Sequence, residues 1–258
     1  MTAEQTAEAI RDGLGGTRLQ SLTFDACLMA TIEVGEAVKG VTETMIGAED
    51  ITVTPIPWDR ITAAAQTPAQ REPERFCRLV LDSVQTYRKR PTIETMAFSA
   101  LRLNADWEIL IARIDRLSEA LIDALKSEPE AVGRAVLATP RLSLMDETHP
   151  YYVGDYYQRD LVAFCQTLQQ HVQSPAVRQA TVETIEGVAR VVIAKATDSS
   201  QTMADGLSIY LPTWPVAMDA YAETDFARHT RWDDFLRALH GSGSATDAPL
   251  PPPLPLPR

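Results

Sequence analysis

Cys27 is the residue of this chain whose surroundings best suit nucleophilic chemistry. Residues 19–24 alternate apolar and polar side chains, which predicts a half-buried strand, and an apolar pattern with helical spacing runs from Met29 to Val41. Cys27 is therefore predicted at a strand-to-helix junction, in the first turn of the helix, where unpaired backbone N–H groups and the helix dipole favour a thiolate. Attack would also need a histidine and an oxyanion hole. A small buried residue at the junction is the alternative, and spacing alone leaves it open.

Asp25 lies two residues before Cys27. Alternate side chains of an extended chain share one side of a sheet, so both residues are expected on the same side. A carboxylate near the thiol would raise the pKa of that thiol, which argues against Asp25 as an activating base. Pairing with an incoming Arg or Lys side chain suits it better. The alternative, that Asp25 only caps the following helix, also stays open.

The other two cysteines lack such a setting. Cys77 and Cys165 sit in apolar segments with helical patterns, which predicts small buried residues. An odd, widely spaced set of three cysteines is no disulfide framework, and no pair has the spacing of a zinc site. We therefore expect no metal site.

The pattern of elements predicts an α/β fold with a largely parallel sheet, since strands alternate with helices. The expected strands cover residues 19–24, 43–48, 92–103 and 206–212. The expected helices cover residues 2–13, 73–88, 107–126, 158–173, 175–188 and 232–239. A single domain is expected over residues 1–240, followed by a flexible Gly/Ser and then Pro-rich tail over residues 241–258.

Composition excludes several classes of function. The net charge is −11 and the densest basic run is Arg88-Lys89-Arg90, which argues against nucleic acid as a partner. No apolar run approaches the roughly 20 residues that a membrane span needs. The N-terminus lacks the pattern of a signal peptide, so a cytoplasmic protein is expected, with a secreted or periplasmic one if Met1 is not the native start. Nucleotide-binding P-loop, zinc-protease and serine-hydrolase motifs are absent.

Several motifs, in the same order, resemble those of clostripain-like cysteine peptidases. The segment Phe24-Asp25-Ala26-Cys27-Leu28-Met29-Ala30, with Glu33-Val34 beyond it, is similar to the nucleophile motif of that family. Further similar segments cover residues 46–50, 55–61, 98–103, 205–212 and 230–236. The resemblance extends over about residues 1–240.

The resemblance implies a caspase-type, three-layer α/β/α fold in which Cys27 is the nucleophile. It implies that Asp25 lies at the floor of the main specificity pocket and that cleavage follows Arg or Lys. Glu49 or Asp50 would supply a second pocket acid, and Trp58 would line the substrate cleft. The alternatives are a solvated loop charge for either acid and a core position for Trp58. Some relatives require calcium, although no oxygen-rich calcium loop is evident here.

One departure concerns the histidine. The family carries its catalytic histidine upstream of the nucleophile, whereas only 26 residues precede Cys27 here, and none of His149, His171, His229 and His240 suits the role. The resemblance therefore implies a heavy-chain-like subunit whose fold is completed by a histidine-bearing N-terminal fragment, or light chain, after proteolytic processing between the two. The alternative is a catalytically inactive, caspase-like interaction or regulatory subunit.

Overall fold

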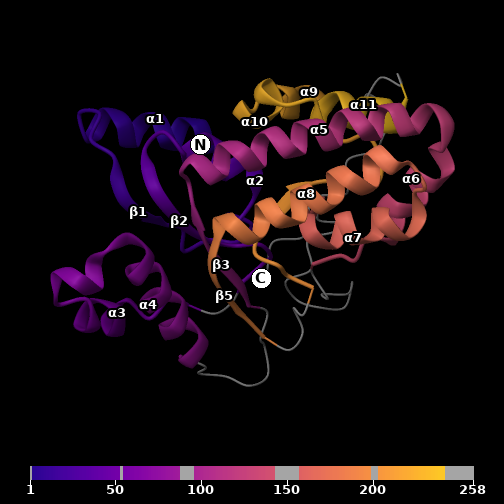
Figure 1. Ribbon diagram of the computed structural model, residues 1–258. Coiled ribbons are helices and arrows are strands. Elements are labelled where there is room, and N and C mark those ends of the chain that lie inside the picture. The colour runs from indigo at the N-terminus through magenta and orange to yellow at the C-terminus, as the bar shows by residue number, and fades with distance from the viewer. Residues whose placement is uncertain (1, 53–54, 88–95, 143–156, 199–202, 242–258) are drawn as a thin grey trace, which may run out of the picture.

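A four-stranded sheet organises the computed structural model, which describes residues 2–52, 55–87, 96–142, 157–198 and 203–241 (Figure 1). Its strands lie in the order β1 (Leu19–Thr23), β2 (Thr42–Ala48), β3 (Ala97–Arg102) and β5 (Val192–Thr197). β1 and β2 are parallel, and β3 runs antiparallel to both β2 and β5. In this sheet β1, β2 and β5 thus run in one direction, and the predicted α/β class is confirmed.

Helices cover both faces of the sheet. α4 (Pro73–Thr86) packs against all four strands on one face. The other face meets α2 (Ile32–Val38) and α5 (Ala105–Ser127), and α8 (Pro175–Val191) packs on α5 (Figure 1). Alternation along β2 divides the two cores, because Met45 packs with the Trp107 cluster while Ile46 packs with the Val80 cluster. The result is a three-layer α/β/α arrangement.

The remaining elements are short or lie away from this sheet. They are α1 (Ala3–Gly13), α3 (Trp58–Ala64), the 3-10 helix η1 (Pro68–Arg71), α6 (Pro129–Ala138), α7 (Leu161–His171), α9 (Met218–Ala222), α10 (Asp225–His229) and α11 (Trp232–His240). β4 (Gln158–Asp160) pairs antiparallel with β6 (Ser208–Tyr210). The predicted tail, apart from Gly241, lies outside the described residues.

The region predicted as one helix over residues 158–173 differs from the prediction at its start. Its first three residues form β4, because they pair with β6. Asp160 then caps α7, accepting a hydrogen bond from the Ala163 N–H at 2.7 Å. Pairing with β6, about 50 residues later in the chain, therefore determines where α7 begins.

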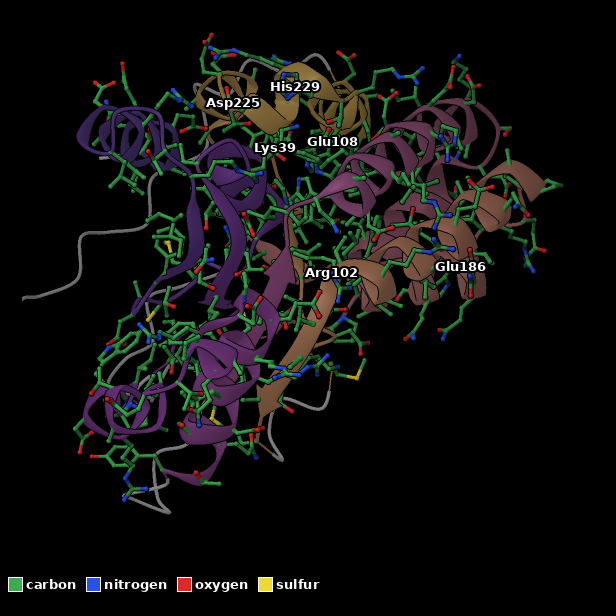
Figure 2. All side chains as sticks on the ribbon, turned by 60° about the vertical axis from the view of Figure 1, so that its left-hand side comes forward. Lys39, Arg102, Glu108, Glu186, Asp225 and His229 are labelled. Atoms are coloured by element: carbon green, nitrogen blue, oxygen red, sulfur yellow. The ribbon has the colours of Figure 1, made fainter. Side chains whose placement is uncertain are left out.

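A buried carboxylate links α2, the helix that follows Cys27, to its neighbours. Glu36 accepts hydrogen bonds from the Trp107 indole N–H at 2.9 Å and from His229 Nδ1 at 2.8 Å, and it pairs with Lys39 at 2.7 Å. Lys39 also pairs with Glu108 of α5 at 2.9 Å. Figure 2 shows Lys39, Glu108 and His229 gathered at one end of the molecule. These bonds fix α10 and α5 against α2.

Candidate active site

Cys27 lies on the loop between β1 and α2, over residues 24–31. Helix α2 begins at Ile32 and is capped by Thr31, whose hydroxyl accepts a hydrogen bond from the Val34 N–H at 3.2 Å. The prediction that Cys27 occupies the first turn of this helix is therefore wrong. Because the effect of a helix dipole falls off within the first turn, the dipole of α2 is not positioned to act on the sulfur.

Two strands hold this loop out of the helix. The Ala30 N–H donates to the Ala48 carbonyl at 2.9 Å, and the Ala30 carbonyl accepts from the Ser208 N–H at 3.0 Å. Leu28 has a φ of 59°, a left-handed conformation that a helix excludes. The Ala30 N–H and carbonyl thus bond to β2 and β6 and are not available to an earlier turn of α2.

Gly47 allows the loop to cross closely over β2. A Cβ atom at this position would lie 2.8 Å from the carbonyl carbon of Met29 and 2.9 Å from the backbone nitrogen of Ala30. A real Cβ atom essentially never lies this close to backbone atoms, so any larger residue must displace the loop. A glycine inside a strand pattern is a known sign of such an approach, although our sequence analysis did not use it.

The sulfur of Cys27 faces the segment that follows β2. The Thr52 N–H points to Sγ at 3.3 Å, and Sγ lies 3.6 Å from the Thr52 carbonyl. The Leu28 N–H donates to the Asp50 carbonyl at 3.3 Å, which ties the two segments together. The Thr52 backbone thus offers this sulfur both a donor and an acceptor, and this contact was not foreseen from the sequence.

The three cysteines differ in accessibility. Cys27 is half-buried, whereas Cys77 and Cys165 are completely buried, as predicted for small core residues. Burial raises the pKa of the Cys77 thiol, and it raises the pKa of the Cys165 thiol strongly. Buried thiols of high pKa are poor nucleophiles, so Cys27 is the cysteine that an external electrophile can reach.

Asp25 and Trp58, both predicted to contact substrate, lie together. The Trp58 indole N–H donates to Asp25 Oδ2 at 3.2 Å, and both side chains are exposed. Asp25 does not cap α2, because the helix begins at Ile32 and Thr31 is its cap. Trp58 is likewise not a core residue. Two of the alternatives left open by the sequence are therefore removed.

Glu49 and Asp50 are buried, contrary to the idea of solvated loop charges. Glu49 is 0% exposed and Asp50 is 1% exposed. Glu49 Oε1 accepts from the Gly206 N–H at 2.8 Å, and the backbone N–H of Ile51 donates to Asp50 Oδ1 at 2.6 Å. The alternative of a solvated loop charge is therefore wrong for both residues, and the role of a second pocket acid stays a prediction.

Glu49 instead faces the carboxyl group of Asp160. Burial and the charge of Asp160 raise the pKa of Glu49 well above its usual range, and burial raises the pKa of Asp160 to about 6. No N–H or O–H group of the described residues donates to Glu49 Oε2. Two buried carboxyl groups side by side cannot both ionise cheaply, so the pair holds one proton at neutral pH.

No described histidine hydrogen-bonds to Cys27. His229 binds Glu36, and His240 Nε2 lies 3.1 Å from the carbonyl of Pro212. His171 lies at the end of α7, and His149 is outside the described residues.

The described residues hold no group of three or more His, Cys, Asp or Glu side chains that could bind a metal ion. Among the helices within them, none is long and apolar enough to cross a membrane.

Known structures share this fold. A clostripain from Bacteroides thetaiotaomicron ATCC 29148, in complex with the peptide inhibitor BTN-VLTK-AOMK, is 15% identical with a TM-score of 0.59, and the match covers 89% of this chain and 94% of that chain. A cysteine protease from B. fragilis is 17% identical, with a TM-score of 0.58 and coverage of 91% and 94%. An inactive zymogen C11 protease from Parabacteroides distasonis is 18% identical, with a TM-score of 0.58 and coverage of 89% and 62%. No curated protein matches this chain.

A family model gives the assignment that these distant likenesses cannot give alone. The model of the clostripain family, Peptidase C11, matches residues 2–238. This range contains both the Cys27 loop and the strands that hold it. The predicted resemblance is thereby confirmed, and the chain belongs to the clostripain family.

Proposed function

We propose that this chain is the heavy-chain-like subunit of a cysteine endopeptidase that cleaves after Arg or Lys, with Cys27 as nucleophile. The observation that carries this proposal is the setting of Cys27. It is the one cysteine that is not buried, it lies on a loop held by β2 and β6, and a backbone N–H points at its sulfur. Membership of the clostripain family supports the same chemistry.

The reaction would proceed through an acyl-enzyme. The Cys27 thiolate attacks the scissile carbonyl carbon and forms a C–S bond, while backbone N–H groups stabilise the oxyanion. A histidinium then protonates the leaving amine as the C–N bond breaks. Water, deprotonated by the same histidine, attacks the acyl carbon and releases the acid and the thiolate.

Asp25 would bind the basic side chain of the substrate. Its carboxylate is exposed, and no described Lys or Arg forms an ion pair with it. Arg60, on the helix that carries Trp58, lies over the Tyr87 ring at 4.8 Å from the centroid. Asp25 is therefore available to an incoming cation. The inhibitor bound to the Bacteroides thetaiotaomicron clostripain, whose peptide letters end in K for lysine, supports this proposal.

A second polypeptide segment would supply the histidine. β1 has β2 as its single strand neighbour among the described residues, which leaves one edge available for a further strand. This chain also covers 62% of the zymogen relative, so that protein contains sequence with no counterpart here. We infer that a histidine-bearing light chain pairs with β1 and that proteolytic processing between the two halves activates the enzyme.

Active-site labelling of the enzyme, isolated with any bound partner, tests the assignment. Acyloxymethyl ketone peptides ending in Lys or Arg should add one peptidyl methyl ketone at Cys27, because the thiolate displaces the carboxylate leaving group, and Cys27→Ala should abolish the adduct. A histidine-bearing fragment should co-purify. A lone chain with no adduct at Cys27 would refute the proposal.

Replacing the pocket acid tests the substrate class. Asp25→Asn should lower kcat/KM for basic substrates by roughly ten- to a hundredfold, because one partner of a charge-assisted hydrogen bond is lost. Asp59→Asn, at an exposed position next to Trp58, is the matched control and should leave kcat/KM within about twofold. Equal effects of the two variants would remove Asp25 from the pocket.

One observation favours a second candidate. Because no described histidine bonds to Cys27, the chain could serve as a catalytically inactive, caspase-like interaction or regulatory subunit. The labelling experiment separates the two functions, since an inactive subunit would resist the inhibitors even with its partner bound.

A further inference from the structure

The hydrogen bond between Trp58 and Asp25 divides the two oxygens of the candidate pocket carboxylate. The indole N–H occupies Oδ2 at 3.2 Å, whereas no described residue donates to Oδ1. Trp58 is 38% exposed, so this contact lies where a substrate side chain can reach it. The carboxylate therefore offers an arriving cation one open oxygen.

Trp58 is also held firmly in place. Ile56 and Ile61, on either side of it, are buried in the core beneath α4. The Trp58 N–H donates to the Ile56 carbonyl at 2.9 Å, and the Thr62 hydroxyl donates to the Trp58 carbonyl at 2.7 Å. The indole therefore projects from a turn that is anchored in the core on both sides of Trp58.

Lysine and arginine make different demands on such a carboxylate. A lysine ammonium is a point charge that can bind a single oxygen. A guanidinium binds best as a fork, with two parallel N–H donors on the two carboxylate oxygens. Arginine must displace the indole to reach this geometry, whereas lysine can bind Oδ1 with the indole in place.

We propose that Trp58 is a specificity-determining residue that makes this site favour lysine over arginine. The proposal rests on the proposed function, because it assumes that Asp25 receives the basic side chain. The Trp58 indole hydrogen-bonds to the Asp25 carboxylate before substrate arrives. An arginine side chain must break this bond to bind both oxygens, so its binding is weakened by the free energy of that bond, whereas the binding of lysine is not.

Second-order rates of Cys27 labelling test this proposal in the enzyme with its partner bound. Two acyloxymethyl ketone peptides that differ only in a terminal Lys or Arg are compared. The wild type should react faster with the Lys reagent. Trp58→Phe, which keeps a ring but lacks the donor, should raise the Arg-to-Lys rate ratio by roughly two- to tenfold, as expected for loss of one hydrogen bond. Trp58→Gln, which restores an N–H donor, should return the ratio toward the wild-type value.

Trp214→Phe is the matched control, because Trp214 is similarly exposed at 36% and packs edge-on against Tyr157. It should leave the ratio unchanged. An unchanged ratio in Trp58→Phe, or equal gains with both reagents, would overturn the specificity role while leaving the peptidase assignment intact. No labelling of Cys27 by either reagent would overturn both.

Discussion

Glu36 in α2 and Glu49 at the end of β2 are two buried glutamates, and their surroundings are opposite. Glu36, 2% exposed, is surrounded by the Trp107 indole, the Lys39 ammonium and His229. Glu49, 0% exposed, has one backbone donor and faces the carboxyl group of Asp160. The Glu36 carboxylate has hydrogen-bond donors or cations on both of its oxygens. The Glu49 carboxyl group, by contrast, is stable beside Asp160 only while one of the two groups is protonated.

The Glu36 bonds between helices therefore do not depend on protonation of a carboxyl group, whereas the contact between Glu49 and Asp160 does. The bonds of Glu36 join α2, α5 and α10 under any condition in which its partners keep their protons. The Glu49–Asp160 pair joins the end of β2 to α7 and to Gly206, but its stability depends on protonation. Both links bear on the loop that carries Cys27, since it runs from β1 into α2 and crosses β2.

Removing the Glu36 carboxylate should have the largest effect on stability. Glu36→Ala leaves the buried Trp107 indole and His229 without their acceptor and leaves Lys39 with Glu108 alone, and we expect it to lower the free energy of unfolding by about 3 kcal/mol, the upper end of the cost of an unsatisfied buried donor. Denaturant unfolding measures this loss. Glu108→Ala, which removes the exposed partner of Lys39, should cost less than about 1 kcal/mol. Similar losses in both variants would mean that the buried network has no special strength.

Overpacking next to Trp107 tests the same link without changing any charge. A Cβ on Gly35 would overlap the Trp107 ring, so Gly35→Ala must push the indole away from Glu36. We expect a loss of about 1–3 kcal/mol in thermal unfolding. Gly133→Ala in α6, where a Cβ meets nothing within 4 Å, should instead be neutral or stabilising. A neutral Gly35→Ala would contradict the close packing described.

The pH dependence of the Glu49 variant gives the smallest expected effect. Because the pKa of Asp160 is raised to about 6, the folded state binds more protons than the unfolded state between about pH 4 and pH 6, and stability falls as pH rises through that range. The raised pKa of Glu49 extends the fall to higher pH. Glu49→Gln mimics the protonated form.

Stability curves at pH 5 and pH 8 check this prediction. Glu49→Gln should match the wild type at pH 5 and exceed it by about 1–2 kcal/mol at pH 8, because the folded wild type must keep a proton on Glu49 that the unfolded chain releases, whereas the variant has no such proton to keep. Asp59→Asn is the control for an exposed carboxyl group and should give parallel curves. A wild type whose stability rises from pH 5 to pH 8 relative to Glu49→Gln would reverse the sign and refute the shared proton.

Much of the fold follows from local pattern. The strands at residues 19–24 and 43–48 and the helices starting near Pro73 and Trp107 were predicted, because periodic burial on one face marks such elements directly. The start of α2 was not, since the Ala30 carbonyl is used by Ser208 and the Ala30 N–H by Ala48. The predicted start of α7 was wrong for the same reason, because residues 158–160 pair with β6. Hydrogen bonds between strands that are far apart in the sequence cannot be predicted from the residue pattern of a short segment.

The site shows a similar division. The motif around Cys27 pointed to this sulfur and to Asp25, and the similar segment over residues 55–61 pointed to Trp58. The contact between Asp25 and Trp58 joins residues 33 positions apart, so no spacing rule could reveal it. Glu49 is buried with its hydrogen-bond donor Gly206 157 positions away, so the sequence could not exclude the alternative of a solvated charge, which is wrong.

Among the described residues, one edge of β1 has no strand partner, and this has a consequence for the isolated chain. Backbone groups along such a strand edge can pair with any extended segment, including the same edge of another copy. The proposed light chain would then cover this edge as well as supply the histidine. A preparation deprived of that cover should accumulate dimers and larger species as its concentration increases.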